Sequence, residues 1–100
     1  MSNDVEIEIT GREAKLILKY GYPFEEQAEI FKPISGKSGY HVVKINKYWL
    51  ELILGDLCRS IREVKSLSLQ EELDCLCDNL EFAIKYAKGN MKITEVVHKI

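Results

Sequence analysis

The chain has 100 residues, of which 46% are apolar and 30% are charged, and its formal net charge is −2. This apolar content excludes a disordered chain, and no apolar run approaches the ~18 residues that a membrane span needs. The slightly acidic balance gives no electrostatic footprint for nucleic acid. We therefore expect one domain with a single core, spanning residues 1–100, with neither a membrane nor nucleic acid as a partner.

The three cysteines, Cys58, Cys75 and Cys77, cannot all pair within one chain, and the first residues carry no secretion signal. Reduced thiols and a cytoplasmic location are the expected consequence. Two positions along a helix are turned by about 200° about its axis, so Cys75 and Cys77 cannot chelate one metal ion. We expect Cys58 and Cys77 to be buried as small apolar side chains.

The N-terminal segment begins with strict alternation of apolar and acidic residues over residues 5–9, which predicts a half-buried strand. Thr10 and Glu13 have the spacing of a capping box, which predicts a helix over about Gly11–Tyr20. Every second residue over 16–20 is also apolar, so a second strand is the competing interpretation. We favour the helix.

Two further elements precede the middle of the chain. Pro23 favours the start of a short helix over residues 24–31, and residues 33–39 have the composition of a loop. The β-branched residues 40–45 then predict a strand that pairs antiparallel with residues 5–9. The loop contains Gly-Lys-Ser but lacks the upstream glycine of a phosphate-binding loop, and a strand follows it, so we expect no phosphate site.

The second half of the chain predicts an antiparallel helical hairpin over residues 47–88. Asn46 can cap a first helix over about residues 47–65, and Ser68 with Glu71 matches a capping box for a second. Apolar residues repeat at spacings of four and three along both helices, and the link between them is very short. The predicted seam of the first helix consists of Leu50, Leu54, Leu57, Ile61 and Val64.

These elements define the expected fold class. It is α+β and mainly helical, with a long antiparallel helical hairpin, a small two-stranded sheet and short N-terminal helices. Residues 1–46 form the mixed β/α segment, and residues 89–100 form a tail after Gly89, which ends the second helix. The tail fits a helix slightly better than a strand.

The predicted second hairpin helix is acidic, with no basic residue from Leu69 to Ile84. A functional interpretation is a cation site or a surface that attracts a basic partner. We favour a structural one, because acidic side chains stabilise a helix N-terminus. In an antiparallel hairpin the basic end of the first helix, with Arg59, Arg62 and Lys65, lies beside this acidic start, so we expect ion pairs there.

Residues for catalysis are present singly but form no recognisable arrangement. Nucleophilic catalysis needs a serine or cysteine with a histidine and an orienting acid, and zinc needs several converging ligands. His41 and His98 lie far apart in the sequence and have no neighbouring ligand pair. We expect no enzyme activity, no catalytic residue, no cofactor and no metal.

Three aromatic rings, those of Tyr20, Tyr22 and Phe24, fall within five residues at a predicted turn. The favoured interpretation is corner packing, in which the rings fill the space between the N-terminal elements and the hairpin. The functional alternative is a recognition surface, because rigid rings dominate binding hot spots.

A secondary face of the first hairpin helix carries Tyr48, Leu52 and Gly55, opposite its seam. A glycine inside a helix costs about 1 kcal/mol relative to alanine, so we expect another group to approach the Gly55 backbone closely. Either the rest of the chain or a second copy covers this face, and the sequence does not favour one over the other.

The function predicted from these features is that of a small protein-binding module: an adaptor, a regulator or an immunity-type inhibitor that works by surface complementarity. The predicted partner-binding residues are Tyr20, Tyr22, Phe24, Tyr48, Leu52 and Gly55. One alternative is a homo-oligomeric structural helical-bundle protein. A less favoured alternative is a small-ligand-binding domain, which requires a pocket where polar groups from Tyr20, Glu25, His41 or Arg59 converge.

Overall fold

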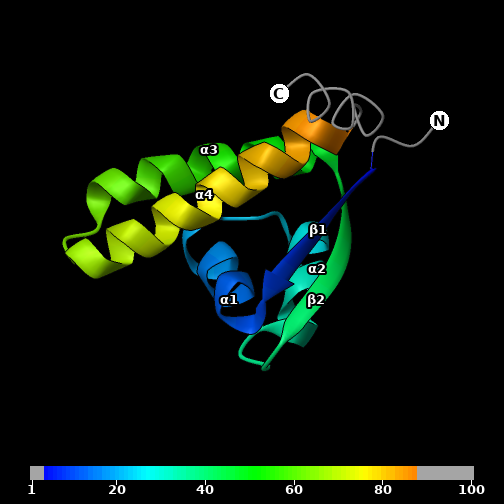
Figure 1. The fold of residues 1–100 in the computed structure, drawn as a ribbon, viewed down its shortest axis with the longest axis horizontal. Helices are drawn as coiled ribbons and strands as arrows, with labels where there is room; N and C mark the ends of the chain where they lie inside the picture. Colours follow the sequence, from blue (N-terminus) through cyan, green and yellow to red (C-terminus); the bar gives the residue numbers. More distant parts are fainter. Residues whose placement is uncertain (1–3, 88–100) are drawn as a thin grey trace, which may run out of the picture.

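Two short strands, with short helices between them in the sequence, precede a long helical hairpin (Figure 1). The structure is a computed structural model that describes residues 4–87. Its elements in chain order are β1 (Asp4–Thr10), α1 (Gly11–Tyr20), α2 (Glu25–Phe31), the 3-10 helix η1 (Lys32–Ile34), β2 (Tyr40–Asn46), α3 (Lys47–Glu63) and α4 (Leu67–Ala87). The predicted α+β, mainly helical fold is confirmed. The predictions for Gly89 and the tail of residues 89–100 lie outside the described residues.

The two strands form an antiparallel sheet in which Val5 lies opposite Ile45. Alternation along β1 buries its apolar side chains on one face and leaves its acidic side chains exposed on the other. On the outer face Lys44 Nζ lies 3.9 Å from a carboxylate oxygen of Glu6. The predicted pairing of residues 5–9 with residues 40–45 is therefore confirmed.

Helix α1 starts at a complete capping box. The Glu13 backbone N–H donates to Thr10 Oγ1 (3.1 Å), and the Thr10 backbone N–H donates to Glu13 Oε1 (2.9 Å). Ala14 and Ile17 are fully buried, at helical spacing. The predicted helix over Gly11–Tyr20 is therefore confirmed, and the competing strand is wrong. The capping box satisfies the first backbone donors locally, and the burial follows a helical period.

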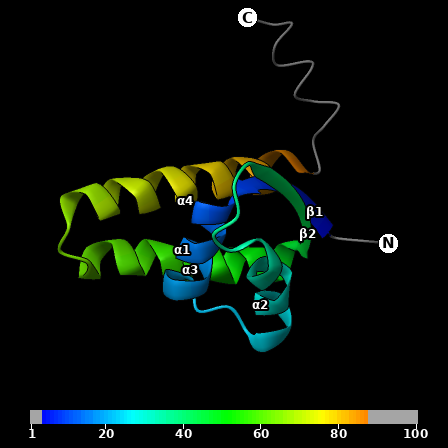
Figure 2. The same cartoon turned by 90° about the horizontal axis from the view of Figure 1, so that it is seen from below.

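Helices α3 and α4 lie side by side as the predicted hairpin (Figure 2). As predicted, Asn46 caps α3, where its Oδ1 accepts from the Tyr48 N–H (2.9 Å). The predicted start of α4 is wrong by two residues: Ser66 rather than Ser68 caps it, since the Leu69 N–H donates to Ser66 Oγ (3.3 Å). The Gln70 side chain also donates to the Val64 carbonyl (2.8 Å), which favours the earlier start.

The predicted seam of α3 is rotated relative to the observed core. The most buried positions are Leu50, Ile53, Leu57 and Ser60, whereas Leu54, Ile61 and Val64 are only partly buried. The reason is that α3 packs against α1 and β2 as well as α4, so its buried face lies between these elements. On α4 the buried residues are Leu73, Leu76, Cys77 and Leu80.

The hairpin lies on one side of the molecule, and α1, α2 and the sheet lie on the other (Figure 1). The sheet lies at the end of the hairpin where α3 begins (Figure 2). Within residues 4–87, no helix has both the length and the apolar character required to cross a bilayer.

Candidate functional site

The turn between α1 and α2 is held against α3 by a glycine. The Gly21 N–H donates to the Ile17 carbonyl (2.9 Å), and a Cβ on Gly21 would stand only 2.9 Å from Ile53 Cγ2. The next residue, Tyr22, has a φ of 47°, which L-residues other than glycine rarely adopt. Such strain is retained where the surroundings impose it, and it is concentrated at functional sites. The Tyr22 side chain is 64% exposed.

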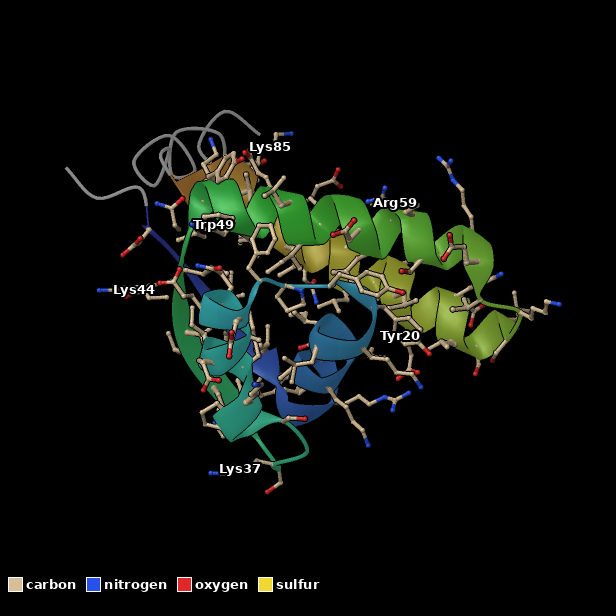
Figure 3. The ribbon with its side chains drawn as sticks, turned by 180° about the vertical axis from the view of Figure 1, so that it is seen from behind. Tyr20, Lys37, Lys44, Trp49, Arg59 and Lys85 are labelled. Atoms are coloured by element: carbon tan, nitrogen blue, oxygen red, sulfur yellow. The ribbon has the colours of Figure 1, made fainter. Side chains whose placement is uncertain are left out.

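Two exposed rings are held in place by Trp49. The ring of Phe24 meets that of Trp49 edge-on at 5.2 Å between centroids, and the ring of Tyr48 does so at 5.0 Å. Trp49 is partly buried and packs on the core at the start of α3, on the side that faces α2 (Figure 3). Phe24 and Tyr48 nevertheless remain 61% and 60% exposed. Their rings are thus ordered by packing and open to a partner.

Leu52 extends this region along α3. It follows Tyr48 by one helical turn and is 42% exposed. We call the four residues Phe24, Tyr48, Trp49 and Leu52 the aromatic surface; the exposed Tyr22 lies two residues before Phe24 in the turn. It combines part of the predicted turn with part of the predicted secondary face of α3, two regions that are separate in the sequence.

The close approach predicted at Gly55 is wrong for the described part of the chain. Apart from the adjoining residues and the backbone of α3 itself, no atom of residues 4–87 lies within 4 Å of the position that a Cβ on Gly55 would occupy. The reason is the orientation of α3: the elements that pack on it do so on the side of Leu50 and Leu57, and Gly55 lies on the opposite side. Residues 4–87 therefore leave the Gly55 backbone uncovered.

Tyr20 belongs to the core packing rather than to the aromatic surface. Its ring is partly buried against the core, and its carbonyl accepts a hydrogen bond from the buried Ser60 Oγ (2.9 Å). Figure 3 shows Tyr20 beneath the middle of α3. The favoured corner-packing interpretation therefore holds for Tyr20. It is wrong for Tyr22 and Phe24, which are both more than half exposed, although one edge of the Phe24 ring contacts Trp49.

Acidic side chains border the aromatic surface. Glu25 and Glu26 open α2 directly after Phe24, and Glu51 precedes Leu52 on α3. All three are exposed, and none forms an ion pair with another residue in the range 4–87. Arg59, on the same side of α3, is paired with Asp56. Three exposed carboxylates without an ion pair within residues 4–87 thus adjoin the aromatic surface in the sequence, together with one basic residue, Lys47, directly before Tyr48.

The acidic start of α4 makes a different ion pair from the predicted ones. Arg12 of α1 binds Glu72 through two parallel contacts of 2.7 and 3.0 Å, and this hydrogen bonding lowers the pKa of Glu72 below its ordinary value. No ion pair within residues 4–87 joins the basic end of α3 to α4. Arg12 reaches Glu72 because β1 packs on α4 and brings the first turn of α1 beside it, a proximity that the sequence does not indicate.

Two open grooves flank α4, but neither fits the predicted ligand pocket. One, of about 610 Å³, lies between α3 and α4 and is lined by acidic and apolar side chains that include Glu51, Leu54, Asp78, Glu81 and Phe82. The other, of about 530 Å³, lies beside Arg12 and Glu72. None of the four polar groups required for a pocket (from Tyr20, Glu25, His41 and Arg59) lines either groove.

The cysteines are placed differently from the prediction in one respect. Cys77 is buried, as expected, whereas Cys58 and Cys75 are exposed. Cys58 lies on α3 between the side that packs on α4 and the side that faces solvent, which explains the difference. Among the residues that the structure describes, no three histidine, cysteine or acidic side chains are grouped as metal ligands.

No protein-family model, curated protein or solved structure matches this chain.

Proposed function

We propose that this chain is a small protein-binding module, acting in the cytoplasm as an adaptor, regulator or inhibitor, and that the aromatic surface is its binding site. The observation that supports this proposal is the placement of Phe24 and Tyr48, which are more than half exposed yet packed edge-on against Trp49. An exposed ring that is already ordered loses little conformational entropy on binding. Tyrosine and tryptophan are also the residues most enriched in binding hot spots.

The partner that fits this surface is a different protein with an apolar patch rimmed by lysine or arginine. The acidic border of Glu25, Glu26 and Glu51 would attract such a rim and accelerate the encounter. A symmetric dimer is less suitable, because a twofold interface brings the same patch of both copies together. The acidic residues of one copy would then approach those of the other.

Site-specific photo-crosslinking in cells tests the proposal. A benzophenone amino acid replaces Tyr48 in one variant and Val42 in a control variant. Val42 is an appropriate control because it is apolar and 65% exposed but lies on the outer face of the sheet, away from α3. We expect a discrete adduct with another protein from position 48 and none from position 42.

The same adduct must respond to the chemistry of the surface. It should be competed away by unlabelled wild-type chain, but not by Phe24→Ala, and it should weaken as ionic strength rises. Phe24→Ala should unfold at close to the wild-type temperature, since its side chain is mostly exposed. An adduct with twice the mass of the chain would replace the proposal with self-association. Equal labelling from positions 48 and 42 would refute it.

A further inference from the structure

Two cysteine sulfurs meet across the helical hairpin. Cys58 Sγ on α3 lies 3.8 Å from Cys77 Sγ on α4, close enough for a weak S–H···S hydrogen bond. A disulfide needs these sulfurs to approach to about 2.05 Å. They are nineteen positions apart in the sequence, so the contact is made by the packing of the hairpin and not by local chain geometry.

The two thiols differ in accessibility and acidity. Cys58 is exposed, whereas only 4% of Cys77 is accessible. Burial raises the pKa of the Cys77 thiol to about 12, and its hydrogen bond with Cys58 and the negative charges of Asp74 and Asp78 act in the same direction. A reagent in solution therefore reaches Cys58 first. Cys75 is also exposed, but it is turned by about 200° from Cys77 about the axis of α4.

We propose that Cys58 and Cys77 form a dithiol site that is oxidised to an intramolecular disulfide by small disulfides of the glutathione type. The Cys58 thiolate attacks one sulfur of the small disulfide, forms a mixed disulfide and releases one thiolate. The Cys77 thiolate then attacks the Cys58 sulfur, which closes the Cys58–Cys77 bond and releases the second thiolate. The protein loses two electrons and two protons, and the small disulfide becomes two thiols.

The bond would fasten α3 to α4. It closes a loop through the link between the helices, which restricts the unfolded chain and therefore raises stability. The Cys58 side of α3 is distinct from the side that carries Tyr48 and Leu52, so oxidation is expected to leave the aromatic surface accessible. The proposal does not depend on the proposed protein binding.

Oxidation of the purified chain with oxidised glutathione tests the site. Wild type should form one internal disulfide, with the loss of two hydrogen atoms, whether or not the exposed Cys75 also carries glutathione, and it should return to its original mass with a reducing thiol. Trypsin should release the peptides Tyr48–Arg59 and Ser66–Lys85 joined by a disulfide. The thermal unfolding midpoint should rise by at least about 5 °C on oxidation.

Matched variants identify the sulfurs. Cys75 and Cys77 lie on the same tryptic peptide, so Cys75→Ser distinguishes them, and it should behave like wild type. Cys58→Ser changes an exposed residue and should form no internal disulfide. Cys77→Ala should carry glutathione on Cys58, as the exposed Cys75 also can, and should form no internal disulfide. The proposal is overturned by a wild-type product that stops at the glutathione adduct on Cys58, by loss of the link in Cys75→Ser, or by a link that fails to raise the midpoint.

Discussion

Replacing Gly55 with alanine is expected to raise the free energy of unfolding by about 1 kcal/mol. Gly55 lies within α3, where alanine is favoured over glycine by this amount because glycine loses more backbone entropy on folding. No opposing steric cost is expected, since within residues 4–87 no atom other than those of the adjoining residues and the α3 backbone itself stands within 4 Å of the new Cβ. For a chain of this size the change corresponds to an increase of about 4–8 °C in the thermal unfolding midpoint.

The assay is thermal and urea unfolding of wild type and Gly55→Ala at two protein concentrations that differ by a large factor. A stabilisation that is the same at both concentrations agrees with an uncovered helix face. Destabilisation at both concentrations would refute the reasoning, because it would mean that another part of the chain packs on Gly55. Destabilisation only at the higher concentration would show that a second copy does so.

Three further predictions concern the core and its contacts. Gly11→Ala should lower the free energy of unfolding, measured in urea, by at least about 2 kcal/mol. The new Cβ would overlap the Lys37 backbone and stand 2.8 Å from the Ile34 carbonyl oxygen, so an unchanged urea midpoint would contradict this contact. Ser60→Ala should lower the free energy of unfolding by about 1–2 kcal/mol in the same assay, because it removes the hydrogen bond to the Tyr20 carbonyl. An unchanged free energy would mean that water replaces that bond. Because the pKa of Cys77 is about 12 in the folded chain and about 8.5 when unfolded, the folded state binds the proton more tightly. Under reducing conditions the stability of wild type relative to Cys77→Ala should therefore be constant below about pH 8.5 and fall as pH rises towards 12, by up to ~1.4 kcal/mol per pH unit.

Interactions within a few residues were readable from the sequence. The capping box of Thr10 and Glu13 and the cap at Asn46 depend on side chains that reach backbone groups two or three residues away. The start of α4 was less predictable, because Ser66 and Ser68 are both suitable caps. The choice between them coincides with the bond from Gln70 to the Val64 carbonyl, which the spacing of the serines did not indicate.

The candidate site was predictable only in part, because it too depends on contacts between segments that are distant in the sequence. The sequence identified an aromatic turn and a secondary face on α3, but it favoured burial of the turn. Which ring is buried depends on how α1 packs on α3 through Gly21, and this packing covers Tyr20 while leaving Phe24 exposed. Trp49, the ring that orders Phe24 and Tyr48, carries no distinguishing signal in the sequence, because its contacts with both rings arise from the packing of the turn on α3.

The composition and hydrophobic periodicity by themselves determined the two strands, the helices and the hairpin, since each follows from a repeat of two or 3.6 residues and from local caps. The tertiary structure alone decided the angular position of each helix about its axis. That position leaves Gly55 uncovered by residues 4–87, places Arg12 beside Glu72, and brings Cys58 to Cys77. The physical reason is that a helical period fixes which residues share a face, whereas only packing against distant segments decides which face is covered.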